Sequence, residues 1–538
     1  MVFARRSTTL LAAIIASCAM VLSLTACTSD NKTVVDGQTT VTSNSAGGVA
    51  VFTPSDGITL NQQMPLNKWA KLVPDLTKAL VDAGFKKGDI NHTTSDSLAK
   101  QSRAIQDFVV DHLSNNTTDD SGIAIAPDNM TLLVAPVVEA DASTRQYGDY
   151  VSQNLSTNDV TDEGATSDGE SSKDDSSNTE SDSTASDEQA QAVDRLVSSL
   201  KLAKESGMHV VLLGNSIEGY KPDAFVKFSD AQTIGKLQAE KMVSKLKLDK
   251  ASKDNPKYIE VLLPYTAVDE KGNANDSTFA QEAFRGIWQV LGSYYQKGVV
   301  ESPSGTLDGK STENDWQAVA YDAAKEGSTA KVLDKRLAKT DGQSTLTRID
   351  GIITMNDYIA SEVVKELDDL GYTGSAADIN PQITISGIVG NITGKKDLSR
   401  DAVPDPIKSP ENDNANDSSS SDDDADEDTS ASDKDRDSQW PLVTGYGAYV
   451  SNIPSIVNGK QWMTGMEDRQ TIATDIAQAC AKLNKDEALN SMPSIRSSEV
   501  GGVKKIPTIS EPLLAVSASN LKSALIDPGY ISLADAGL

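Results

Sequence analysis

Short apolar runs alternate with longer amphipathic segments along most of this chain. The short runs are rich in valine, leucine and isoleucine, which is typical of buried β-strands. The longer segments carry apolar residues three and four positions apart, and several end at glycine, which predicts α-helices. We expect strands at residues 48–53, 89–92, 130–135, 208–213, 258–263, 352–355, 381–388, 441–444 and 512–516, and helices at residues 66–84, 95–113, 187–207, 278–296, 315–337 and 357–371.

Strands that alternate with helices of this length indicate βαβ units and parallel sheets. Four strands are predicted up to residue 213, and the alternation of strands and helices starts again near residue 258. The fold class that this predicts is α/β, with two doubly wound lobes. The glycine-rich stretch Gly214–Gly219 ends a strand without opening a helix, so we interpret it as a connection between the lobes.

The clearest unit lies between Trp440 and Arg469. The apolar run at residues 441–444 predicts a strand, followed by a Gly/Tyr turn and a helix that ends at Asn458-Gly459. A further strand and a helix beginning near Asp468 complete the unit. The loop after such a strand lies at its carboxyl end, where open α/β sheets bind ligands.

The first residues are typical of a secretion signal. Arg5-Arg6 precede an apolar segment at residues 10–24, which is too short to be a reliable membrane span. The ending Leu24-Thr25-Ala26-Cys27 resembles a bacterial lipobox, which implies cleavage before Cys27 and lipid attached to it. The alternative is an ordinary signal peptide in which Cys27 stands by chance. The Thr/Ser/Asp/Gly-rich residues 28–48 fit a disordered tether that holds the protein on the extracytoplasmic face of the cell membrane.

Acidic residues outnumber basic ones by 78 to 49, and the formal net charge of -29 argues against a nucleic-acid partner. Two segments, residues 154–186 and 409–439, consist almost entirely of Ser, Asp, Glu, Asn and Thr. They lack the apolar surface that would offset the entropy of ordering, so we expect disordered inserts. A calcium site at residues 422–428 is the alternative, but that run lacks the glycine and spacing of a calcium loop.

Neither the cysteines nor the histidines indicate a catalytic or metal site. Of the 3 cysteines, only Cys480 falls within a predicted helix, where a small buried apolar role is expected. The 3 histidines are scattered without ligand spacing, and nucleophile elbows and phosphate-binding loops are absent. We therefore predict a protein that is not an enzyme and uses no metal or cofactor.

Aromatic and amide residues next to predicted strand ends suggest a different chemistry. Trp69, Trp316 and Asn356 all lie beside such loops. A flat aromatic face stacks on the CH face of a pyranose, while amides bond its hydroxyl groups. For each tryptophan, packing in a core is an equally plausible role.

Four motifs, in order along the chain, resemble one family. They are Lys68-Trp69, Asp350–Asp357, Trp440–Gly445 and Ile456–Thr464. Together they are similar to the sugar-binding proteins of bacterial ABC importers, of the type I periplasmic binding fold, in the branch of xylose and multi-sugar receptors. The resemblance implies two lobes joined by a hinge, which close on a carbohydrate and deliver it to a membrane permease.

On this resemblance the chain divides into a signal peptide and tether, followed by two lobes that are each completed by later residues. We place the signal peptide at 1–26, the tether at 27–47, the first lobe at 48–225 with completion by about 466–498, and the second lobe at 226–465 with completion by about 499–530.

The same resemblance assigns ligand-binding positions in both lobes. Lys68 would bond hydroxyl groups, Trp69 would line the site, and Trp316 would stack on the sugar. Departures from the family pattern appear at Gly214, Gly447 and Glu467, where the family has charged partners of a sugar, and at Tyr446, where it has glutamine. The ligand-binding residues that we predict are Lys68, Trp69, Asn215, Asp276, Trp316, Asn356 and Tyr446, the last as an added aromatic wall.

Two functions follow from these observations. The first is a lipid-anchored receptor that hands a sugar to an ABC permease. The second is a sensor or adaptor of the same fold, with altered or weak sugar binding, which the lost charged partners and the two acidic inserts favour. Losing each charged hydrogen bond removes roughly 1.5 to 3 kcal/mol of binding free energy.

Overall fold

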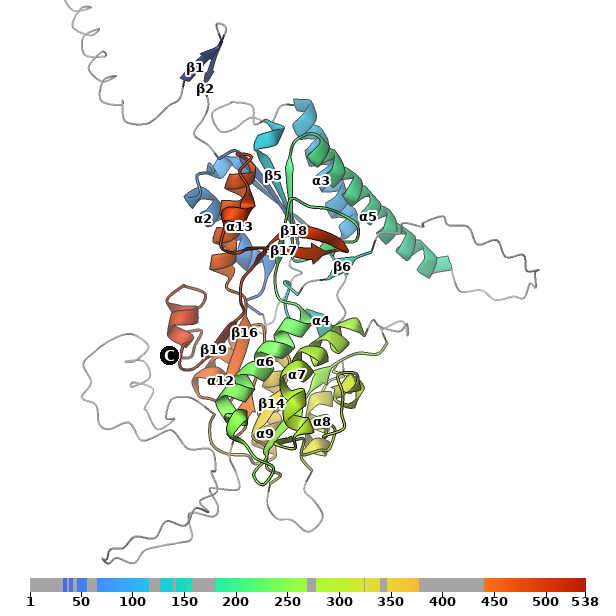
Figure 1. The fold of residues 1–538 in the computed structure, drawn as a ribbon, viewed down its shortest axis with the longest axis vertical. Helices are drawn as coiled ribbons and strands as arrows, with labels where there is room; N and C mark the ends of the chain where they lie inside the picture. The colour runs from blue at the N-terminus through green and yellow to red at the C-terminus, as the bar shows by residue number, and fades with distance from the viewer. Residues whose placement is uncertain are drawn as a thin grey trace, which may run out of the picture.

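A computed structural model describes residues 32–35, 38–41, 46–55, 65–115, 126–138, 142–151, 153–156, 180–268, 277–323, 325–338, 346–376 and 440–538. Two α/β lobes follow one another along the long axis of the molecule (Figure 1). A separate hairpin of β1 (Lys32–Val35) and β2 (Gln38–Val41) precedes them, within residues 27–47, where we expected a disordered tether. The expected signal peptide and the Cys27 lipidation site lie outside the described residues.

The first lobe is built on a seven-stranded sheet in the order β17-β18-β9-β7-β5-β3-β4. Its neighbouring strands are parallel, except for the antiparallel pair β17 and β18. The strands are β3 (Gly48–Pro54), β4 (Ile90–Ser95), β5 (Met130–Val134), β7 (His209–Leu213), β9 (Ala224–Lys227), β17 (Ile495–Val500) and β18 (Val503–Ser510).

Helices cover both faces of this sheet, because β3 is apolar on both sides. Val49 and Val51 pack in a cluster with α2 (Trp69–Asp82) and α13 (Arg469–Leu483). Ala50 and Phe52 point the other way, into a cluster with α3 (Leu98–Asn115) and α5 (Glu180–Glu205). Successive side chains of a strand face opposite sides, so a continuous apolar run requires two helical layers.

The second lobe repeats this plan on a smaller parallel sheet in the order β12-β10-β14-β15. One face packs on α6 and α7, and the other on α8 and α9. The elements are α6 (Ala231–Leu246), β10 (Lys257–Val261), α7 (Thr278–Gln296), β12 (Val300–Glu301), α8 (Ser328–Arg336), β14 (Gly351–Ile353), α9 (Asp357–Asp369) and β15 (Leu442–Val443).

Shorter elements complete the two lobes. The pair β16 (Met463–Met466) and β19 (Leu514–Ser517) is antiparallel. The others are α4 (Ala142–Arg145), β6 (Asn154–Leu155), β8 (Ser216–Ile217), β11 (Leu263–Pro264), β13 (Ala320–Tyr321) and α12 (Ile453–Val457), six short 3-10 turns at residues 87–89, 127–129, 248–250, 315–318, 450–452 and 489–491, and a π-helical turn at residues 522–526.

In the described ranges, three short segments of the chain cross between the lobes. It leaves the first lobe at residues 228–230, returns at residues 467–468, and crosses again at residues 511–513. We expected the second lobe to begin at residue 226, but β9 of the first sheet extends to Lys227. We expected the chain to resume the second lobe at about residue 499, but β18 of the first sheet extends to Ser510. Three short crossings side by side form the hinge that joins the two lobes.

The predicted fold class is confirmed, with two doubly wound lobes. The single helix predicted at residues 315–337 is wrong. A 3-10 turn, the strand β13 and α8 occupy that range, because residues 320–321 pair with β11 and Gly327 turns the chain at a φ of 69°.

Other expected elements shift or fall outside the described residues. The helix expected at Asp187 begins at Glu180, and β6 also falls within the expected insert at residues 154–186. The stretch Gly214–Gly219 does not connect the lobes, because β9 follows it in the same first-lobe sheet. The strand expected at residues 381–388 and the insert at residues 409–439 lie outside the described residues.

The close contact between α6 and α7 at Gly286 predicts that an added methyl group there lowers the stability of the fold. A Cβ at Gly286 on α7 would lie 2.0 Å from the backbone oxygen of Gln232 on α6. Gly286→Ala should lower the free energy of unfolding by about 1–3 kcal/mol, although alanine is normally the better helix former. Urea denaturation measures this, with the exposed Gln289→Ala on the same helix as the control. Equal stability of the two variants would contradict the close packing.

Candidate functional site

Three of the predicted ligand-binding residues follow the carboxyl ends of strands on the side where the sheets meet the hinge. Asn215 follows β7 in the first lobe, while Asn356 follows β14 and Tyr446 follows β15 in the second. Hydrogen bonds cross between the lobes here, from the Leu66 amide to the Gly447 carbonyl oxygen at 2.9 Å. We call this part of the structure the interlobe region.

Lys68 stands at the start of α2 and has a carboxylate partner. Its Nζ lies 2.9 Å from Oδ1 of Asp149, and the other oxygen of Asp149 accepts a bond from the Trp69 amide at 3.1 Å. Both charged side chains remain about one-fifth exposed. The cation is therefore already paired within the first lobe.

Trp69 packs in the core of the first lobe in this conformation. Its side chain is 2% exposed and lies edge-on to Tyr150 and Phe228, with ring centroids 5.1 and 5.6 Å away. Of the two roles considered for this tryptophan, the geometry matches core packing.

The two amide residues also have partners within the chain. Asn215 donates to the Pro136 carbonyl oxygen at 2.9 Å and accepts from the Gln153 amide at 3.0 Å. Asn356 caps α9, because its Oδ1 accepts from the Ile359 amide at 2.9 Å. The Nδ2 of Asn356 donates across the lobes to Oε1 of Gln146 at 3.2 Å.

Trp316 lies in the second lobe, in the 3-10 turn before β13. It is 8% exposed and stands edge-on to Tyr265, with ring centroids 5.1 Å apart. It belongs to the same hydrophobic cluster as Tyr446. Asp276 lies outside the described residues, and contact of any of these side chains with a solute stays a prediction.

Tyr446 and Glu467 meet at the hinge. Tyr446 is completely buried, and its hydroxyl bonds Ser229 Oγ and donates to Glu467 Oε1 at 3.2 Å. The Ser229 amide donates to the same oxygen at 2.7 Å. Glu467 thus links the first and second crossing segments, a role that sequence reasoning missed.

Burial changes the acidity of this hinge cluster. Desolvation raises the pKa of Glu467 to about 7, against the lowering effect of bonds from Ser229 and Tyr446. Desolvation likewise raises the pKa of the Tyr446 hydroxyl. Both groups therefore favour their neutral forms inside the hinge.

A second buried carboxyl organises the second lobe next to Asn356. Asp357 accepts bonds from Gln461 Nε2 at 2.7 Å, Thr464 Oγ1 at 2.8 Å and the Tyr449 amide at 2.9 Å. Burial raises the pKa of Asp357 to about 6. Several residues of the sequence motifs therefore hold the scaffold together.

The segment at residues 142–151 was not singled out from the sequence. Its Tyr147 is completely buried, 4.8 Å from Phe279 and 6.3 Å from Tyr446 between ring centroids. The available signal was the pair Tyr147 and Tyr150 around Gly148 in an otherwise polar stretch.

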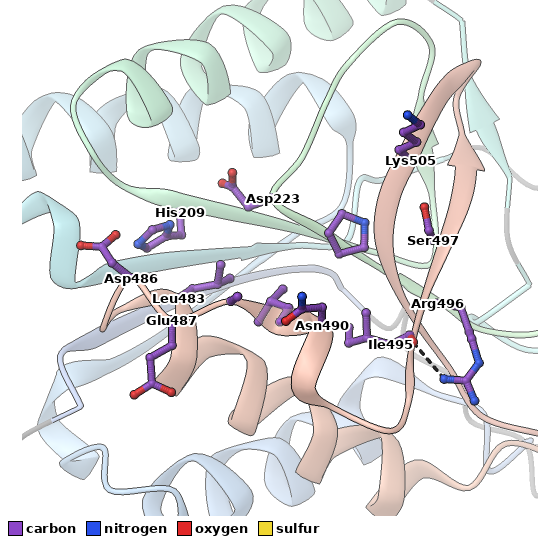
Figure 2. Close-up of a pocket in the computed structure, with 13 residues that line it drawn as sticks. His209, Asp223, Leu483, Asp486, Glu487, Asn490, Ile495, Arg496, Ser497 and Lys505 are labelled. Atoms are coloured by element: carbon purple, nitrogen blue, oxygen red, sulfur yellow. Dashed lines mark hydrogen bonds between the residues drawn. The ribbon is translucent and has the colours of Figure 1, made fainter.

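A cavity of about 630 Å³ lies at the opposite edge of the first sheet (Figure 2). His209 opens β7 and Asp223 precedes β9, so this cavity is at the amino ends of the strands. Several of its charges are already paired: Asp223 with Lys204 at 2.8 Å, and Glu487 with Lys482 at 3.0 Å. The interlobe region remains the better candidate site.

Comparison with solved structures finds proteins that the chain resembles along most of its length. One is an ABC transporter solute-binding protein from Clostridium phytofermentans with bound β-D-glucose, at 17% identity and a TM-score of 0.45, with 91% of this chain and 99% of that chain covered. Another is a carbohydrate transporter solute-binding protein from Chloroflexus aurantiacus in complex with D-glucose, at 19% identity and a TM-score of 0.43, with 92% and 98% covered. A third is a periplasmic ribose ABC transporter from Conexibacter woesei, at 13% identity and a TM-score of 0.43, with 90% and 96% covered.

The first two are solute-binding proteins of the class that the four sequence motifs resemble. At these identities the likeness says nothing about which ligand this chain binds. No protein-family model matches the sequence, and no curated protein matches it.

Two further findings concern the described residues. No helix among them is both long and apolar enough to cross a membrane. Within the same ranges, no group of three or more His, Cys, Asp or Glu side chains is placed to hold a metal ion. Cys480 is buried on α13, as expected, and burial raises the pKa of its thiol.

The hinge carboxyl predicts a pH dependence of stability. Its pKa lies near 7 in the folded chain and near 4.5 when exposed, so the unfolded chain releases this proton first as pH rises. The contribution of Glu467 is full below about pH 4.5 and is lost between pH 4.5 and 7, by up to about 3 kcal/mol. Glu467→Gln keeps an acceptor for the Ser229 amide but cannot ionise.

Urea denaturation from pH 4.5 to 8 should therefore show a smaller loss of stability with rising pH in Glu467→Gln than in the parent. The exposed Glu487→Gln is the control and should follow the parent curve. Parallel curves for the parent and Glu467→Gln would show that the hinge carboxyl does not retain its proton.

Proposed function

We propose that this chain is a solute-binding protein of an ABC transporter, lipid-anchored outside the cytoplasm, which captures a carbohydrate between its lobes and delivers it to a permease. The observation that carries the proposal is the convergence of polar and aromatic side chains from both lobes on a hinge of three short crossings. Ligands of open α/β sheets bind at the carboxyl ends of the strands, which is where these side chains lie.

The available groups suit a polyhydroxylated ligand. Lys68 and Asn356 can donate to hydroxyl oxygens when the lobes separate, and Trp316 with Tyr265 offers aromatic surface for a sugar ring. Asn67, next to Lys68, is 1% exposed, and its Nδ2 has no hydrogen-bond partner among the described residues. A buried amide donor without a partner is costly, so a ligand oxygen there would be favoured.

Transport follows from lobe closure. A permease that binds the closed form more tightly than the open form would respond to the solute, because the solute shifts that equilibrium. The membrane anchor rests on Cys27 and the lipobox-like ending before it.

A sensor or adaptor of the same fold is the second candidate. It is favoured by the intrachain partners of three predicted ligand-binding residues, Lys68, Asn215 and Asn356. A protein whose lobes are already bridged in this way could pass its state to a membrane partner with weak solute binding.

Titration calorimetry of the purified chain with D-glucose, D-xylose and oligosaccharides tests the first proposal. We expect binding tighter than millimolar for at least one of these sugars. Trp316→Ala should weaken that binding about tenfold or more, because it removes the stacking surface.

Tyr294→Ala is the matched control, since Tyr294 is a partly buried aromatic residue of α7 whose hydroxyl donates to Asp249. It should bind the sugar like the parent. Absence of binding to every sugar would favour the sensor, and unchanged binding by Trp316→Ala would remove that residue from the site.

A further inference from the structure

The segment at residues 142–151, here called the strap, belongs to the first lobe but is seated on the second. It follows β5 and consists of α4 and the residues up to Val151. Tyr147 and Val151 are members of a hydrophobic cluster whose other residues all come from the second lobe. The strap therefore contributes to the core of the opposite lobe.

Gln146 makes the polar contacts of the strap with the second lobe. Its side-chain oxygen accepts from Asn356 Nδ2 at 3.2 Å, and its backbone oxygen accepts from the Tyr449 hydroxyl at 2.7 Å. Asn356 caps α9, and the Tyr449 amide bonds the buried Asp357. These partners are fixed by their own networks, so the strap is bound to a rigid part of the second lobe.

Tyr147 makes the apolar contact. Its ring is fully buried between lobes, beside Phe279 at 4.8 Å and Tyr446 at 6.3 Å. Removing this apolar area from water favours the arrangement in which the two lobes are in contact.

The strap is held equally closely to the first lobe. Asp149 pairs with Lys68, and its amide donates to the Asn67 carbonyl oxygen at 2.8 Å. Gly148 has a φ of 93°, and a Cβ there would meet the Asn67 oxygen at 2.7 Å. This close approach lets the strap join the start of α2 to the start of α9.

We infer that the strap is an internal latch that holds the lobes together without a solute and competes with any solute for the interlobe region. It uses Lys68 and Asn356, two of the groups that a carbohydrate would need. The latch rests on the contacts above, and only the competition rests on the proposed function. If the latch must open before a solute binds, the apparent affinity equals the intrinsic affinity multiplied by the fraction of molecules that are open.

Hydrogen exchange of the full chain, measured by mass spectrometry without sugar, tests the latch. The variants are Tyr147→Ala and Gln146→Ala. Exchange should rise about tenfold or more in peptides covering residues 65–69 and 446–450, which line the interlobe region.

The control is Tyr220→Ala, which removes a buried tyrosine from the first-lobe core without touching the second lobe. It should leave exchange in the same two peptides unchanged. If Tyr147→Ala and Gln146→Ala also leave exchange there unchanged, the latch is wrong, whether or not the chain binds sugar.

Calorimetry with D-glucose and D-xylose tests the competition separately. Tyr147→Ala should tighten binding several-fold if the strap competes with the sugar. Weaker binding would overturn the competition and make Tyr147 a ligand contact. Hydrogen exchange that rises in the strap variants would support the latch even if neither the parent nor any variant binds a sugar. In that case the absence of binding would count against the proposed function.

Discussion

The buried contact between Ser229 and Glu467 joins two of the three places where the chain passes between the lobes. This contact and the bonds of Gln146 to the second lobe set the relative position of the lobes, because each lobe is otherwise built on its own sheet. Within the part of the chain that the structure describes, the carboxyl group of Glu467 accepts from a backbone amide and from a tyrosine hydroxyl. Burial in this low-dielectric surrounding favours the neutral carboxyl, against the opposing effect of the hydrogen bonds that it accepts.

A second buried carboxyl, Asp357, explains why the family-like motifs identify a scaffold better than a ligand. Its partners Gln461 and Thr464 belong to the motif at Ile456–Thr464, while Asp357 ends the motif at Asp350–Asp357. The two motifs are thus bonded to each other inside the second lobe. A buried carboxyl left without these donors would carry a large desolvation cost, so the residues act as a unit whatever the ligand is.

In the interlobe region, the groups that could bind a solute are the same groups that bind the strap. Lys68 and Asn356 are suitable partners for hydroxyl groups, yet each is engaged by Asp149 or Gln146 of the same chain. A receptor and a sensor differ in how easily those intrachain bonds give way to a solute. The energy difference between closed and open lobes, rather than the list of polar groups, therefore separates the two functions.

The sequence alone determined the fold class, because helical and strand periodicity are local properties of the chain. β3, α7, and α13 with its Asp468 cap follow from patterns within a few residues of each element. The helix expected at residues 315–337 failed because the pairing of β13 with β11, fifty-odd residues away, overrode local periodicity. The meeting of Tyr446 and Glu467 with Ser229 could not be predicted in this way, nor could the contact of Tyr147 with the opposite lobe. Those contacts join residues more than 200 positions apart, or lie in a loop without periodicity, and depend on how two separately folded lobes come together.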